Sequence, residues 1–179
     1  MYLWIAIDVN EQLRALRENA ESYIKNHRLA SPTLTLPFHI SLKISFQVSD
    51  DILQEVIRDI CVLCKSIEPF TIPVRGIEKT NTIIWLTMEE NACLTAIHSQ
   101  LDELLFKKYG ISQHKFDKSF IFHTSILIMN NQEHIYAAFE AIKDIKIPNV
   151  LNAKKLVIGS SIDGQPGTYS VNEEIFFDF

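Results

Sequence analysis

The sequence predicts an α+β fold built from two similar halves, in which antiparallel sheets face a central cleft and helices pack outside. Hydrophobic residues alternate with a period of two in several short segments and recur at helical spacing in others. The order strand, helix, loop, strand, helix, strand occurs twice, each time over roughly 85 residues. We therefore expect one domain, residues 1–179, made of two pseudo-symmetric lobes at about 1–80 and 81–179.

Each element follows from its local pattern. The first half contains, in order, a strand at 2–9, a helix at 10–27 with Asn10 as N-cap, a loop at 29–37 that holds two prolines, a strand at 38–48, a helix that begins after 49–51 and ends near 67, and a strand at 70–78. The second half contains a strand at 82–88, a helix at 91–109 that Gly110 ends, a strand at 120–129, a helix from 130–132 to 145, a strand at 150–159, a turn at 163–167 and a last strand at 168–178.

Composition excludes several classes of protein. Seventeen Lys and Arg against 22 Asp and Glu give a net charge of −5, which argues against an extended nucleic-acid surface but leaves room for a pocket that binds one phosphate. No stretch approaches the roughly 18 apolar residues of a membrane span, and the N-terminal segment lacks the basic region of a signal peptide. We expect a cytoplasmic protein with no membrane contact, and no obligate protein partner is predicted.

Three cysteines are present, and two of them form a C-x-x-C pattern, Cys61 and Cys64. The pattern lies in a segment whose apolar residues recur at helical spacing, and no second C-x-x-C pattern exists. We therefore predict that both are buried or half-buried helix residues rather than redox or zinc ligands. An odd, sparse cysteine count is also typical of a reducing compartment.

The clearest motif occurs at corresponding places in the two halves. Residues 38–42 read F-H-I-S-L and residues 122–126 read F-H-T-S-I, so both follow F-H-x-S-aliphatic. In the first strand, strict alternation places His39, Ser41 and Lys43 on one face, with His39 and Ser41 roughly 7 Å apart. In the second, His123 and Ser125 interrupt an otherwise apolar face, where polar groups are costly unless they are satisfied.

Two imidazoles brought to one phosphate by a two-fold arrangement suit phosphodiester chemistry. With an unperturbed pKa near 6.5, one ring can be neutral and take a proton from the attacking oxygen, while the other is protonated and gives one to the leaving oxygen. The two serine hydroxyls can donate hydrogen bonds to the non-bridging oxygens. Such a site needs no metal and no cofactor.

At these residues the sequence resembles the 2H phosphoesterases, which include the 2′-5′ RNA ligases and the RNA 2′,3′-cyclic phosphodiesterases. Their signature is two H-x-[ST]-x motifs in a duplicated α+β fold, matched here by HISL at 39–42 and HTSI at 123–126. The resemblance implies that His39 and His123 are the catalytic acid and base, in an order the sequence does not assign, and that Ser41 and Ser125 bind phosphate. It implies a nucleotide or RNA-end phosphodiester as substrate, with 2′-5′ ligation as a further activity of such proteins.

Further side chains could contact a substrate. Lys43 shares a predicted face with His39, and the loop at 111–119 would place His114, Lys115, Phe116 and Lys118 at the rim of the cleft, although each could equally be solvated. Tyr169 could stack on a base or pack at a sheet edge. Trp85 is expected in the core. A metal site formed by His39, His114 and His123 matches no familiar ligand spacing, so no metal is predicted.

The leading hypothesis is therefore a metal-independent phosphodiesterase acting on 2′,3′-cyclic phosphate ends of RNA or on 2′-5′ nucleotide phosphodiesters. One alternative is a non-catalytic module that binds a nucleotide or phosphate ester on the same fold. Another is a structural or partner-binding domain with no ligand in the cleft. Turnover and nucleotide binding distinguish the three.

Overall fold

The chain forms two four-stranded antiparallel sheets covered on their outer faces by helices. The computed structural model describes residues 1–115 and 120–177. The first sheet has the order β2-β1-β7-β8, with strands β1 (Tyr2–Asp8), β2 (His39–Gln47), β7 (Lys155–Ser161) and β8 (Ser170–Phe176). The second has the order β5-β4-β3-β6, with strands β3 (Phe70–Lys79), β4 (Ile83–Met88), β5 (His123–Ile128) and β6 (Val150–Ala153). The predicted fold class is confirmed.

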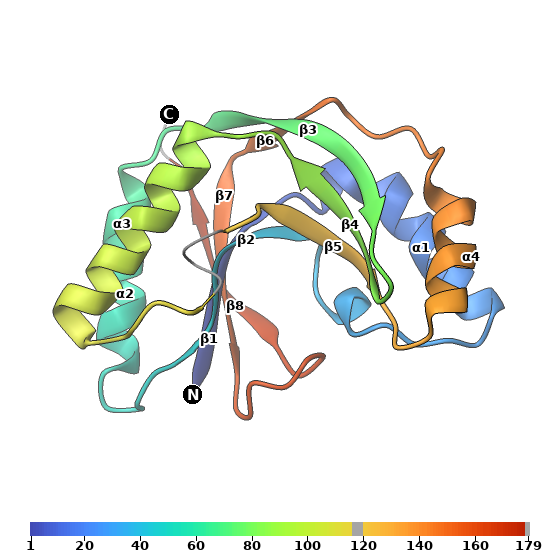
Figure 1. Cartoon of the computed structure of the whole chain (residues 1–179). Helices are drawn as coiled ribbons and strands as arrows, with labels where there is room; N and C mark the ends of the chain where they lie inside the picture. Colours follow the sequence, from blue (N-terminus) through green and yellow to red (C-terminus); the bar gives the residue numbers. More distant parts are fainter. Residues whose placement is uncertain (116–119, 178–179) are drawn as a thin grey trace.

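The helices lie in two pairs, one outside each sheet (Figure 1). Helices α2 and α3 pack against the first sheet, and α1 and α4 against the second. Their bounds are α1 Arg14–Asn26, α2 Leu53–Lys65, α3 Ala92–Tyr109 and α4 Gln132–Ile142, with short 3₁₀ turns η1 at Glu11–Leu13 and η2 at Pro32–Thr35. Each helix turns an apolar stripe inward, and these stripes join the sheets in one continuous hydrophobic core.

Helix ends follow the expected chemistry at three places and depart from it at one. The side chains of Asn91 and Asn131 accept hydrogen bonds from the first backbone N–H groups of α3 and α4. Gly110 ends α3 with a φ of 66°, the left-handed conformation that glycine adopts most easily. Asn10 makes no capping bond; its Oδ1 instead accepts from the backbone N of Phe38, 3.0 Å away.

The two sheets exchange strands between the halves of the chain. The first sheet is completed by β7 and β8 from the C-terminal half, and β3 from the N-terminal half joins the second sheet. The predicted division near residue 80 thus describes the order of elements along the chain, whereas each sheet draws on both sides of it.

The single strand predicted at 150–159 is wrong, because this segment is two strands in different sheets. β6 pairs with β3, and β7, which is separated from β6 by Lys154 alone, pairs with β1. Their burial differs accordingly: β6 alternates between exposed and buried residues at an edge, whereas β7 lies between β1 and β8 and is buried almost throughout.

Both motif strands contain a β-bulge at the same motif position. In β2, Ser41 pairs with Ala6 and Lys43 with Ile5, so Leu42 is an extra residue. In β5, Ser125 pairs with Trp85 and Leu127 with Ile84, so Ile126 is the extra residue. A bulge turns the residues that follow to the other face of the sheet.

The bulges correct the predicted faces. Strict alternation would place Leu127 beside His123 as it places Lys43 beside His39. Lys43 and Leu127 are instead buried on the helix side, with 1% and 0% of their surfaces exposed. Ile44, which the same alternation would place in the core, lines the cleft. A second irregularity in β2 then returns Phe46 to the core face.

The C-x-x-C cysteines are helix residues, as predicted. Both belong to α2, where Cys64 is fully buried and Cys61 is partly buried. Burial raises the pKa of the Cys64 thiol to about 12, so it stays protonated and behaves as a small apolar side chain. Among residues 1–115 and 120–177, no helix is both long and apolar enough to cross a membrane.

Candidate active site

His39 and His123 are the first residues of β2 and β5, the edge strands through which the two sheets contact each other. The Nδ1 atom of His39 lies 2.8 Å from the carbonyl oxygen of Pro37, and that of His123 lies 2.7 Å from that of Ile121. A carbonyl oxygen only accepts, so each Nδ1 carries the hydrogen and donates it. In the neutral ring this leaves the lone pair on Nε2, the atom that takes up or releases the proton.

Each imidazole packs against a tryptophan of the neighbouring strand. The His39 ring centroid lies 4.5 Å from that of Trp4 in β1, with an angle of 32° between the rings. The His123 centroid lies 4.9 Å from that of Trp85 in β4, at 59°. Trp85, expected in the core, thus belongs to the site, and Trp4 was missed. Their matching places in the first strand of each half are the signal that could have found them.

The two serines lie in a cleft next to the histidines. A hollow of about 480 Å³ is lined by Ser41, Ile44, Trp85, Phe120, Ile121, His123 and Ser125. A second hollow of about 190 Å³ is lined by residues that include His39, Tyr169, Pro37 and again Ser125. Because Ser125 lines both, the two hollows adjoin, and the structure brings both histidines and both serines to one region.

The surroundings of the two rings favour their neutral forms. Burial lowers the pKa of His39, and a positive charge on His123 lowers it further, while the bond to Pro37 and the Asp8 carboxylate partly oppose this. Burial likewise lowers the pKa of His123, against the bond to Ile121.

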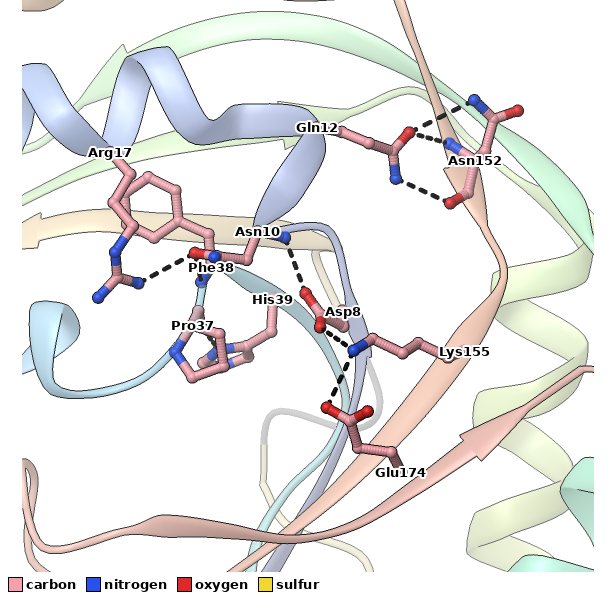
Figure 2. A network of polar contacts seen from close by, with 10 residues as sticks. All are labelled: Asp8, Asn10, Gln12, Arg17, Pro37, Phe38, His39, Asn152, Lys155 and Glu174. Atoms are coloured by element: carbon pink, nitrogen blue, oxygen red, sulfur yellow. Dashed lines mark hydrogen bonds and ion pairs between the residues drawn. The ribbon is translucent and has the colours of Figure 1, made fainter.

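The loop before His39 is held by α1 (Figure 2). Arg17 donates hydrogen bonds to the carbonyl oxygens of Leu34, at 2.9 Å, and Leu36, at 2.6 Å. It also donates to Oδ1 of Asn10, which in turn accepts from the backbone N of Phe38. The segment that carries the Pro37 carbonyl is therefore fixed on both sides of its proline.

A charged row lies beside His39 on the first sheet. Asp8 is the ladder partner of His39, and its carboxylate lies 2.8 Å from Nζ of Lys155, which also pairs with Glu174 at 2.9 Å (Figure 2). One ammonium group is therefore shared between two carboxylates, and Asp8 still acts on His39 as a negative charge.

Lys43, predicted to reach the substrate, lies elsewhere. Its Nζ is 2.5 Å from Oδ1 of Asp102 in α3, and both side chains are almost fully buried. The β-bulge at Leu42 explains the error, because it reverses the face on which Lys43 lies. Its ammonium group balances a buried carboxylate on the helix side of the sheet.

The remaining predicted contacts are placed differently. Tyr169 is half-buried, lines the smaller hollow with His39, and its hydroxyl contacts that of Ser45. Lys115 is exposed in the loop after α3, and His114, one residue earlier, is half-buried; a substrate contact by either stays a prediction. Phe116 and Lys118 lie outside the described residues. Within the described part of the chain, no three His, Cys, Asp or Glu side chains gather as a metal site.

Comparisons with known proteins place the chain in a family and support its fold. The family model of the 2′-5′ RNA ligase superfamily matches residues 7–164. A search of curated proteins found no match. Similar solved structures include TT0787 of Thermus thermophilus (18% identity, TM-score 0.62, covering 98% of this chain and 97% of that one) and LigT of E. coli complexed with NADP⁺ (16%, 0.58, 98% and 96%). Usb1 of Kluyveromyces marxianus is also similar (11%, 0.51, 98% and 97%). The chain belongs to the 2′-5′ RNA ligase superfamily, the 2H phosphoesterases.

Proposed function

We propose that this protein is a metal-independent phosphodiesterase that hydrolyses 2′,3′-cyclic phosphate ends of RNA or 2′-5′ nucleotide phosphodiesters. The observation that carries the proposal is the matched pair of imidazoles. His39 and His123 occupy equivalent places on two adjoining edge strands, and each fixes its Nδ1 hydrogen on the carbonyl two residues earlier. Each ring therefore presents Nε2 for proton transfer.

The two rings divide the proton transfers. The Nε2 of a neutral imidazole takes a proton from water as its oxygen attacks phosphorus. The Nε2 of the other, protonated imidazole donates to the leaving ribose oxygen as its bond to phosphorus breaks. Ser41 and Ser125 donate hydrogen bonds to the non-bridging oxygens, where negative charge is concentrated. After one turnover the protonation states of the rings are exchanged, and proton exchange with water restores them.

The apolar walls of the cleft favour a nucleotide substrate. Ile44, Trp85, Phe120 and Ile121 line the larger hollow and offer flat apolar surface to a base. Tyr169 offers a second aromatic surface at the smaller hollow beside His39. LigT of E. coli, a similar structure, has been solved with 3′-AMP, which supports a nucleotide as the ligand here.

The test is a product-resolved assay in EDTA with nucleoside 2′,3′-cyclic phosphates and with 2′-5′ and 3′-5′ dinucleotides. His39→Asn and His123→Asn are the sharpest variants, because the Asn amide can replace the Nδ1 donor while Nε2 is lost. Each should lower kcat by about 10²- to 10⁴-fold. His134→Ala, an exposed histidine of α4, is the matched control and should retain the rate.

The outcomes separate the hypotheses. Nucleotide binding without turnover would replace the proposal with a binding module, and neither binding nor turnover would remove the ligand site altogether. Because burial lowers the pKa of both rings below 6.5, kcat/KM should be highest on the acidic side of that value. Ligation of RNA ends with 2′,3′-cyclic phosphate would show as a 2′-5′-linked product in the same assay.

A further inference from the structure

The β-bulges of the two motif strands each leave a backbone carbonyl outside the ladder. Leu42 and Ile126, the extra residues, directly follow Ser41 and Ser125. A buried carbonyl without a partner is costly, and a peptide group without a ladder bond can rotate. Leu42 and Ile126 are bonded directly to these serines, so a shift of either bulge residue would move the backbone from which the serine side chain extends. The orientation of these two carbonyls therefore bears on the site.

Each of these carbonyls accepts a hydrogen bond from a side chain of another element. Nδ1 of His98, in α3, lies 2.6 Å from the carbonyl oxygen of Leu42. Oγ1 of Thr33, in η2, lies 2.8 Å from that of Ile126. In both halves, therefore, a side chain donates to the carbonyl oxygen of the residue after the motif serine. The donor is an imidazole N–H in one half and a hydroxyl in the other.

His98 is well suited to hold its bulge rigidly. Its side chain is almost fully buried, and its Nε2 lies 3.6 Å from Oδ2 of Asp102. The Phe120 ring, which lines the cleft, lies 4.6 Å from the His98 ring, centroid to centroid. His98 therefore connects α3 both to the strand that carries Ser41 and to the wall of the cleft.

Thr33 acts together with a neighbouring hydroxyl. Its Oγ1 lies 2.8 Å from Oγ of Ser31, and that oxygen accepts a hydrogen bond from the backbone N of Ile128 at 2.9 Å. The two hydroxyls therefore satisfy backbone groups on both sides of the peptide bonds that follow Ile126. The segment η2 thus lies against β5, an edge strand that β2 also contacts.

We propose that Thr33 and His98 are positioning residues that aim the two phosphate-binding serines, Thr33 acting on Ser125 and His98 on Ser41. The inference deepens the proposed function and assumes it for the role of the serines. Productive geometry must be held within about 0.5 Å, and a displacement of about 1 Å can lower the rate about 10²-fold. Loss of either donor should therefore lower kcat by roughly 10- to 100-fold, with a smaller change in KM.

The test compares variants with and without the donor. Thr33→Val removes the hydroxyl at almost constant shape, and Thr33→Ser restores it. His98→Leu removes the donor, and His98→Asn can return an amide N–H to the place of Nδ1. The donor-free variants should lose rate and the conservative ones should recover most of it, with melting temperatures measured alongside. A loss of rate that tracks the melting temperature in all four variants would overturn the inference.

Double-mutant cycles locate each effect. In a Ser125→Ala background, Thr33→Val should lower activity little further, whereas in a Ser41→Ala background it should lower activity as much as it does in the wild type. His98→Leu should have little further effect in the Ser41→Ala background and its full effect in the Ser125→Ala background. Equal effects in both backgrounds would overturn the inference. The same cycles on the affinity for inorganic phosphate give a readout that needs no turnover. An inactive wild type would therefore refute the proposed function alone, while the phosphate cycles would still decide for or against the positioning roles.

Discussion

The buried ion pair between Lys43 and Asp102 gives a sharp prediction about a residue whose role the sequence left open. Lys43→Met removes the ammonium group and keeps most of the side-chain volume. The Asp102 carboxylate, with 4% of its surface exposed, then retains the Gln113 amide at 3.0 Å and the His98 imidazole at 3.6 Å. Breaking one side of a buried pair costs about 3–5 kcal/mol. For a chain of this size, that corresponds to a fall of roughly 6–20 °C in Tm.

Removal of both charges should be tolerated. Leu127, which occupies the equivalent place after the bulge of β5, is an apolar residue in the same kind of environment. We expect Lys43→Met with Asp102→Leu to regain most of the lost free energy of unfolding, because apolar replacement of a buried pair is often neutral or stabilising. Urea unfolding at pH 7 measures both variants.

Activity completes the test, since Lys43 lies on the far side of the sheet from the cleft. Measured well below the melting temperature, kcat/KM of the single variant should remain within about threefold of wild type. A loss of a hundredfold or more in Lys43→Met would contradict the placement of Lys43 away from the cleft. A single variant as stable as wild type would contradict the reasoning on the buried charge.

Three further predictions concern the histidines and their supports. Because burial lowers the folded-state pKa of His39 and His123 below 6.5, the unfolded state binds more protons between that lowered pKa and 6.5. The free energy of unfolding should therefore fall as pH drops below 6.5. It should fall less steeply in the double variant with His39→Asn and His123→Asn, and equal slopes against pH in the two proteins would contradict this reasoning. Gly159→Ala would place a methyl group in steric overlap with the Trp4 indole and should cost about 1–3 kcal/mol in urea unfolding, partly relieved by Trp4→Phe. Arg17→Met should lose about 1.5–3 kcal/mol and lower kcat by loosening the loop before His39; unchanged values of both would exclude that support.

Much of the site could be predicted because its chemistry is carried by a repeated local pattern. The two F-H-x-S segments identify the histidines and serines, and the structure brings all four to one region. Periodicity also placed the helices, since each turns a regular apolar stripe toward a sheet. These features depend on residues close together in the sequence.

The errors arise where pairing between distant segments decides. A β-bulge exists only relative to a partner strand, so strict alternation put Lys43 on the wrong face. The break between β6 and β7 depends on which sheet each strand joins, which residues 150–159 do not encode alone. Trp4 was missed because an apolar strand residue has the same pattern whether it faces a core or supports an imidazole.

The exchange of strands between the halves makes the two sheets depend on each other during folding. β1 pairs residue 2 with residue 161, so the central contact of the first sheet closes nearly the whole chain into a loop. Topologies dominated by such distant contacts fold slowly. A fragment that ends near residue 80 would leave β1 without β7 and β3 without β4, with unpaired edges prone to aggregation.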